Sequence, residues 1–152
     1  MAITICHESP DTHEAAALVR ELDAYLLPLY PLESHHGLDV SALVAERVSF
    51  FVLRLDGVAA GCGGVKIYAG EYGELKRMYI RPAYRERGLS RLLLHHIEGF
   101  TRAQGVNLLR LETGVLQDAA IGLYRTMGFI EVGPFGAYKL DPQSIFFEKW
   151  LG

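Results

Sequence analysis

One junction constrains the fold of this chain more than any other segment: an arginine-rich turn that joins a predicted strand to a predicted helix. Residues 73–80 have the composition of a β-strand that ends before Pro82. From Leu89 onward, apolar residues recur at helical spacing. Gly88 stands at the boundary, where the lack of a Cβ lets the backbone approach a ligand closely. The chain must therefore place a strand, a basic turn and a helix N-terminus next to one another.

Positive charge is concentrated at this junction. Residues 76–91 hold six of the 15 basic residues and one acid, so this window carries +5, and the rest of a chain with net charge −3 carries −8. A local basic cluster in an acidic chain indicates one compact anion, whereas nucleic acid favours a basic surface with interleaved aromatic residues. A solvated helix start is the alternative. We therefore expect no nucleic-acid partner.

Length and composition indicate one globular domain over residues 1–152, because 50% of the residues are hydrophobic and 22% are charged. The apolar runs are too short to span a membrane, and the N-terminal residues do not resemble a signal peptide. Cys6 and Cys62 lack the spacing of metal ligands, which fits reduced thiols. We therefore expect a cytoplasmic protein with no membrane partner.

The predicted elements alternate between strands and helices. Strands are expected at residues 3–7, 48–55, 58–68, 73–80, 106–113, 129–132 and 144–150. Helices are expected at about 11–27, 39–46, 89–105 and 118–127, with Asp11, Asp39 and Asp118 as N-caps. The predicted inner face of the third helix consists of Leu89, Leu92, Leu93, Ile97 and Phe100. This order predicts a mixed α/β domain with a largely antiparallel sheet flanked by helices.

The basic junction is suited to a pyrophosphate. A helix N-terminus presents unpaired N–H groups and partial positive charge, and Arg85 and Arg87 can add charge-assisted hydrogen bonds. Neither the P-loop pattern nor the dinucleotide-binding Gly-x-Gly-x-x-Gly pattern is present in the sequence. The predicted anion site is therefore of another kind.

Two motifs resemble those of the GNAT superfamily of acetyl-CoA-dependent N-acetyltransferases. Arg85-Glu86-Arg87-Gly88-Leu89-Ser90 is similar to the family's Arg/Gln-x-x-Gly-x-Gly/Ala signature, with Ser90 in place of Gly or Ala. Residues 117–129 are similar to its Asn-x-x-Ala-x-x-Leu-Tyr-x-x-x-Gly-Phe motif, with Gln117 in place of Asn. The stretch from Tyr138 to Ser144 also resembles that of small bacterial single-domain members.

The resemblance implies the GNAT fold, acetyl-CoA as co-substrate and no metal. It also implies a coenzyme site in three parts. The backbone of Met78, Tyr79 and Ile80 would pair with the pantetheine arm like an added strand. The pyrophosphate would be held by Arg85, Glu86, Arg87, Gly88, Leu89 and Ser90. Gln117 and Tyr124 would complete the coenzyme contacts.

The resemblance also suggests catalytic roles. Periodicity alone makes Tyr124 a packed core residue, but its match to the second motif makes it the candidate acid for the departing thiolate. Glu74 is the candidate base, with an exposed edge-strand charge as the alternative. Glu71 and Glu112 are weaker candidates for the same role. The backbone N–H of Met78 or Ile80 would polarise the thioester carbonyl.

The acceptor is expected to contact the segment between the first two helices, through Tyr30, Glu33 and His35. The adjacent pair His35-His36 has no third ligand at a suitable spacing, so we predict no metal there. The predicted activity is direct acetyl transfer, in a ternary complex, to a primary amine of a small molecule. Acetylation of peptide lysines or N-termini, or a silent CoA-binding regulatory module, are the alternatives. The apolar segment 145–151 is expected to pair across a homodimer.

Overall fold

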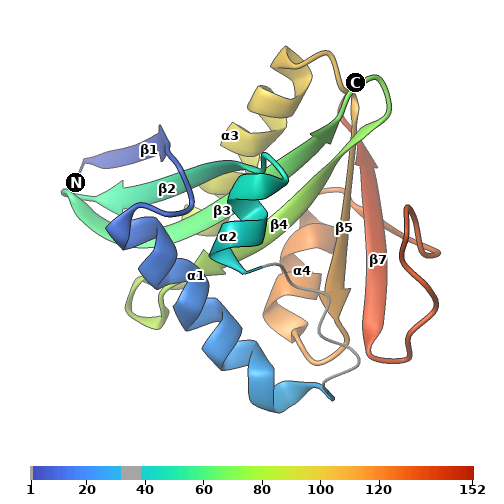
Figure 1. Ribbon diagram of the computed structural model, residues 1–152, viewed down its shortest axis with the longest axis horizontal. Helices are drawn as coiled ribbons and strands as arrows, with labels where there is room; N and C mark the ends of the chain where they lie inside the picture. Colours follow the sequence, from blue (N-terminus) through green and yellow to red (C-terminus); the bar gives the residue numbers. More distant parts are fainter. Residues whose placement is uncertain (1, 32–38) are drawn as a thin grey trace.

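The computed structural model describes residues 2–31 and 39–152. These residues form a seven-stranded sheet with the order β1-β2-β3-β4-β5-β7-β6 (Figure 1). The strands are β1 (Ile3–His7), β2 (Ser49–Leu55), β3 (Val58–Tyr68), β4 (Tyr72–Ile80), β5 (Leu108–Gly114), β6 (Ile130–Val132) and β7 (Ser144–Trp150). The β4–β5 pair is parallel and the other neighbouring pairs are antiparallel. The predicted mixed fold and largely antiparallel sheet are thus confirmed.

Helices cover both faces of the sheet. They are α1 (His13–Leu26), α2 (Val40–Ala45), α3 (Leu89–Ala103) and α4 (Asp118–Thr126), with the 3-10 turns η1 (Leu27–Leu29) and η3 (Pro82–Tyr84). One core packs α1 and α2 against β2 and β3, and another packs α3 and α4 against the opposite face (Figure 1). Within the described part of the chain, no helix combines the length and apolar character needed to cross a membrane.

The parallel pair separates soon after it forms. Strands β4 and β5 are in register at Gly73–Leu109 and Glu74–Arg110, and Figure 1 shows them diverging toward their carboxyl ends. Each strand leads into a helix beyond this opening, β4 into α3 and β5 into α4. Ligands of α/β proteins bind beyond the carboxyl ends of such strands, so the divergence marks a candidate site.

A β-bulge interrupts β4 just beyond the opening. Two residues of β4, Arg77 and Met78, face one residue of β3, and Arg77 has a left-handed backbone with φ 58°. The bulge changes the side to which later residues point. Leu75 before it and Ile80 after it both join the α3 core, although five positions separate them, while Tyr79 packs against the α1 core.

Two predicted N-caps are wrong by one residue. Thr12, not Asp11, precedes α1, and its hydroxyl accepts a hydrogen bond from the Ala15 amide at 3.4 Å. Gln117 precedes α4 without a side-chain cap, which makes Asp118 the first helical residue. Asp39 caps α2 as predicted. A capping side chain must sit directly before the first helical residue, and composition alone does not fix that position.

The predicted inner face of α3 is correct except at Leu92. Leu92 is 45% exposed, whereas Leu94 is fully buried. Leu89, Leu93 and Ile97, spaced by four residues, define the stripe on the sheet. Leu94 flanks that stripe and Leu92 lies outside it, because a helix rotates by about 100° per residue.

The expected pairing of β7 with a second subunit is not supported. β7 lies between β5 and β6, and the residues Phe146, Phe147 and Glu148 are paired on both sides. A strand needs a free edge to add another strand. The predicted homodimer would therefore need another surface.

Candidate active site

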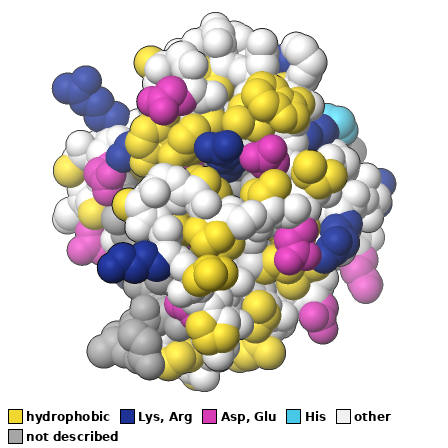
Figure 2. All heavy atoms as spheres, turned by 90° about the vertical axis from the view of Figure 1, so that its right-hand side faces the viewer, with side chains coloured by type: hydrophobic (Ala, Val, Ile, Leu, Met, Phe, Trp, Pro, Cys, Tyr) yellow, Lys and Arg dark blue, Asp and Glu magenta, His cyan; other side chains and the backbone are white. Residues whose placement is uncertain are grey.

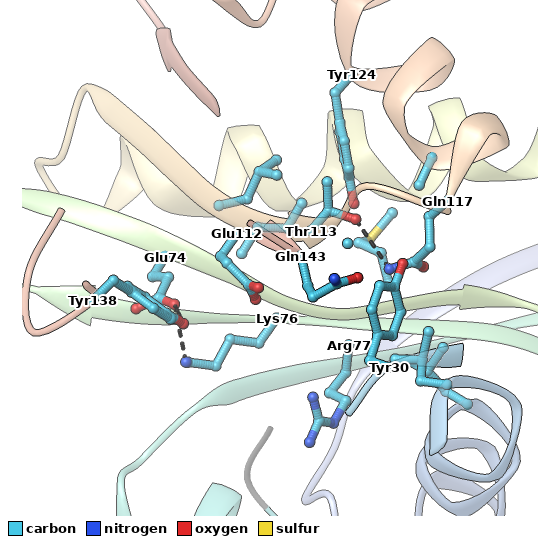
Figure 3. Close-up of a pocket in the computed structure, with 17 residues that line it drawn as sticks. Tyr30, Glu74, Lys76, Arg77, Glu112, Thr113, Gln117, Tyr124, Tyr138 and Gln143 are labelled. Atoms are coloured by element: carbon cyan, nitrogen blue, oxygen red, sulfur yellow. Dashed lines mark hydrogen bonds and ion pairs between the residues drawn. The ribbon is translucent and has the colours of Figure 1, made fainter. Parts of the chain in front are cut away.

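A cavity of about 160 Å³ opens where β4 and β5 diverge (Figure 3). Its walls come from residues 74–78 of β4, residues 111–114 of β5, the end of α1 and the start of α4. Tyr30, Tyr138 and Gln143 reach it from loops. Residues distant in the sequence therefore meet at the opening of the sheet.

Tyr124 reaches the cavity from α4. Its ring is 5% exposed and packs edge-on against Phe129, with the ring centroids 5.5 Å apart. Figure 3 shows the ring directed from the helix into the cavity, and the hydroxyl has no hydrogen-bond partner among the described residues. Burial raises the pKa of Tyr124 well above its ordinary value, so the hydroxyl stays protonated. A packed ring with a protonated hydroxyl in a cavity can act as a proton donor.

Glu74 lies at the opposite end of the cavity and is 4% exposed. Its Oε2 atom accepts a hydrogen bond from the Tyr138 hydroxyl at 2.6 Å and one from Lys76 Nζ at 3.1 Å. The alternative prediction of an exposed edge-strand charge is therefore wrong. Burial, followed by the nearby Glu74 carboxylate, raises the pKa of Tyr138 and keeps it a donor.

A second carboxylate, Glu112, also lines the cavity. Its Oε2 atom accepts a hydrogen bond from the Ser144 hydroxyl at 2.7 Å. Figure 3 shows its side chain between those of Glu74 and Gln143. Glu71 is exposed at the turn before β4 and does not line the cavity. Glu74 and Glu112 line the cavity and therefore remain the two candidates for the general base.

Tyr30 forms a wall with the end of β5. Its hydroxyl accepts a hydrogen bond from the Leu116 amide at 3.1 Å, and burial raises its pKa. Gly114 is required there, because a Cβ at that position would lie 1.9 Å from the Tyr30 hydroxyl oxygen. Gln117 lines the same wall and donates from Nε2 to Thr113 Oγ1 at 3.2 Å. The predicted contacts Tyr30 and Gln117 thus meet at one cavity.

The basic turn after β4 has the backbone expected of an anion site. Glu86 and Gly88 have left-handed φ angles of 64° and 75°, and Gly88 is the N-cap of α3. Alternation of this kind gathers backbone amides into a concave surface. A Cβ at Gly88 would meet no protein atom within 4 Å, so the space beside it is open. Leu89 is 3% exposed and packs in the core under α3, which anchors the start of that helix.

The model of the acetyltransferase (GNAT) family matches residues 13–129. The chain belongs to the GNAT family. It is an acetyl-CoA-dependent acetyltransferase, as the motifs at residues 85–90 and 117–129 predict. The order of its elements and its splayed parallel strands follow from the same architecture.

Full-length relatives support this assignment. The chain is 47% identical to an IAA acetyltransferase of Azospirillum brasilense over 98% of both chains. It is 38% identical to the N-acetyltransferase YedL of Escherichia coli K12, over 92% of this chain and 90% of that one. A solved structure from Klebsiella pneumoniae, described as an acyl-CoA N-acyltransferase, shares 34% identity and a TM-score of 0.84, covering 99% and 98% of the two chains.

Two arginines of this GNAT chain, Arg85 and Arg87, lie at the basic turn and contact tyrosine rings. Arg85 donates from Nε to the Ile80 carbonyl at 2.9 Å and lies over the Tyr79 ring, with its guanidinium carbon 5.9 Å from the centroid. Arg87 lies over Tyr84 at 5.7 Å. These contacts position both side chains beside the basic turn, where they can meet an anion.

Arg81 has a structural partner. Its guanidinium donates to the Glu21 carboxylate at 2.7 and 3.0 Å and to the Ala59 carbonyl at 2.9 Å. The hydrogen bond from Arg81 lowers the pKa of Glu21. The pair joins the end of β4 to α1, so part of the positive charge in the sequence window serves the fold.

Several cavity residues have no assigned role in the sequence prediction. Among them are Lys76, Thr113, Gln143 and Tyr138. Tyr138 belongs to the stretch 138–144, whose resemblance to small family members is the sequence signal that could have pointed to its place in the site. Glu33 and His35 lie outside the described residues. Among the described residues, no group of three or more His, Cys, Asp or Glu side chains could hold a metal ion.

Proposed function

We propose that this acetyltransferase moves the acetyl group from acetyl-CoA directly to a primary amine of a small molecule, within a ternary complex. One observation carries the proposal: the protonated Tyr124 hydroxyl and the carboxylates of Glu74 and Glu112 line one cavity between β4 and β5. Amine acetylation needs a group that accepts a proton from the amine and a group that donates a proton to the thiolate, and this cavity holds both kinds of group.

The residues act in sequence. Glu74 accepts a proton from the ammonium group, directly or through water, and the neutral amine attacks the thioester carbonyl carbon. A backbone N–H of β4, at Met78 or Ile80, stabilises the oxyanion that develops. When the C–S bond breaks, Tyr124 donates its proton to the thiolate. The nitrogen loses its second proton to solvent, which leaves the amide and CoA as products. Glu74 then releases its proton to solvent and Tyr124 takes one up, so one proton is released in each turnover.

The coenzyme would occupy the predicted three-part site. The pantetheine arm would pair with residues 78–80 of β4, where β5 has diverged. The pyrophosphate would meet the amides and side chains of residues 85–90. Gln117 and Tyr124 would flank the thioester end, since both line the cavity.

Two facts support a small acceptor. The cavity is about 160 Å³, which suits an amine and its immediate substituents rather than a folded surface. The relative from Azospirillum brasilense is named as an IAA acetyltransferase, which favours a small molecule over a protein. A cytoplasmic location and a homodimer remain predictions.

Calorimetry with acetyl-CoA, followed by CoA release across a panel of amines, tests the proposal. We expect binding to the purified protein and CoA release with at least one small primary amine. Release with peptides alone would favour peptide acetylation. Binding without release across the panel would favour a silent CoA-binding module, and absence of binding would refute both the coenzyme site and the activity.

A further inference from the structure

A second cavity, of about 760 Å³, adjoins the first. The two share the lining residues Glu74, Lys76, Tyr138 and Gln143. The Tyr138 hydroxyl donates a hydrogen bond to Glu74 (Figure 3). Because both residues line both cavities, this pair lies where the two cavities meet. A molecule in the larger cavity therefore has its inner end beside the proposed base.

The larger cavity has an aromatic lining. Tyr68 and Tyr72 stack with ring centroids 4.7 Å apart and an interplanar angle of 30°. Tyr138 is held edge-on against Phe135 at 5.2 Å and Phe146 at 5.5 Å. These contacts place three tyrosine rings around the cavity and fix their orientation, so the aromatic lining is built before any ligand arrives.

The cavity carries no excess of either charge among the described residues that line it. Its carboxylates are Glu74 and Asp141, and its ammonium groups are Lys76 and Lys139. Glu74 and Lys76 are paired with each other. Figure 2 faces the side of the molecule that holds β7 and shows hydrophobic side chains with single charged groups between them. Such a surface does not favour a polycationic acceptor.

We propose that the larger cavity binds the body of the acceptor and selects an aromatic primary amine, in which a short chain joins the ring to the amino group. The ring lies among Tyr68, Tyr72 and Tyr138, and the amino group passes Tyr138 to reach Glu74 and Glu112. Aromatic rings bind such linings through stacked and edge-on contacts. This inference rests on the proposed acetyl transfer and gives that reaction a substrate class.

Steady-state acetylation of 2-phenylethylamine, butylamine and spermidine tests the inference. We expect kcat/KM for 2-phenylethylamine to exceed that for butylamine at least tenfold, since only the former has a ring to bury. We expect kcat/KM for spermidine to be lower than that for 2-phenylethylamine. This comparison uses the unaltered protein and so does not depend on the folding of a variant.

The variant Tyr68→Ala removes one ring that no catalytic step uses. It should lower the preference for 2-phenylethylamine over butylamine by roughly 3- to 10-fold, the contribution of one aromatic contact. Trp150→Ala is the matched control, because Trp150 is 67% exposed and lines neither cavity. It should leave the preference unchanged.

The outcomes separate this inference from the proposed function. Transfer to amines without preference for a ring, or preference unaltered by Tyr68→Ala, overturns the aromatic acceptor site alone. A preference for spermidine also overturns it. Absence of transfer to any amine overturns the proposed acetylation and the inference with it.

Discussion

At the scale of single residues, the Tyr124 hydroxyl is the sharpest test of the mechanism. Tyr124→Phe keeps the packed ring and removes one oxygen that has no partner among the described residues. We expect kcat to fall by about 10²- to 10⁴-fold, the usual contribution of general acid catalysis. Calorimetry should give an unchanged acetyl-CoA affinity, and an unchanged kcat would return Tyr124 to a packing role.

The raised pKa of Tyr124 predicts the shape of the pH profile. Because the pKa of Tyr124 lies above the ordinary value of a tyrosine, its hydroxyl keeps its proton at every pH up to that ordinary value. We therefore expect no loss of kcat from Tyr124 ionisation up to about pH 10. Profiles of the unaltered protein and Tyr124→Phe should have alkaline limbs with the same midpoint. A limb that disappears in the variant would contradict this expectation.

Matched substitutions can identify the base. Glu74→Gln and Glu112→Gln each replace a carboxylate by a neutral group of the same shape, and either amide oxygen can still accept the neighbouring hydroxyl hydrogen bond. We expect Glu74→Gln to lower kcat by about 10²-fold or more and Glu112→Gln to have a much smaller effect. Single-turnover acetylation measures both. The reverse order would assign the base to Glu112.

The residue scale is also where sequence reasoning reaches its limit. Local motifs identify Tyr124, Gln117 and the basic turn because each lies within a short pattern. The hydrogen bond from Tyr138 to Glu74 spans 64 positions, so no local period indicates it. The pairing of Arg81 with Glu21 is likewise a property of the folded chain.

At the scale of elements, the two ends of α3 provide an internal control. Gly88 before the helix and Gly105 after it have φ angles of 75° and 78°, and a Cβ at either would meet no atom within 4 Å. Alanine at either site should cost about 1 kcal/mol of unfolding free energy, measured by urea denaturation. Gly88→Ala alone should also weaken acetyl-CoA binding at least tenfold by calorimetry. Equal loss of affinity in both variants would refute the predicted phosphate site.

The elements themselves could be predicted because each has a local signal. Asp56-Gly57 indicates the β2–β3 turn, and the stripe of Leu89, Leu93 and Ile97 indicates α3. Strand order has no such signal. Placement of β7 between β5 and β6 depends on long-range pairing, which is why the sequence did not reveal that β7 lacks a free edge for the expected pairing across a homodimer.

At the scale of the whole molecule, the coenzyme should join the two parts of the sheet. Strands β4 and β5 share two register pairs, so a ligand lodged between them adds contacts to both sides. At 100 times Kd, acetyl-CoA should stabilise the protein by about 2.7 kcal/mol, or roughly 5–10 °C in Tm. Differential scanning calorimetry measures the shift. Tyr124→Phe should retain it and Gly88→Ala should reduce it, whereas an unchanged Tm in the unaltered protein would contradict the site.

The bulge in β4 sets which side chains of that strand point to each face of the sheet. Arg77 is the extra residue, so the strand before it and the strand after it are out of phase with respect to the two faces of the sheet. Deletion of Arg77 would remove the bulge, and Met78 and Ile80 would stay on the face that they share with Leu75. Deletion of a residue from the regular part of the strand removes no extra residue, so it would send every later side chain to the opposite face. The bulge is therefore the one position in β4 where the strand can lose a residue without exchanging its two faces.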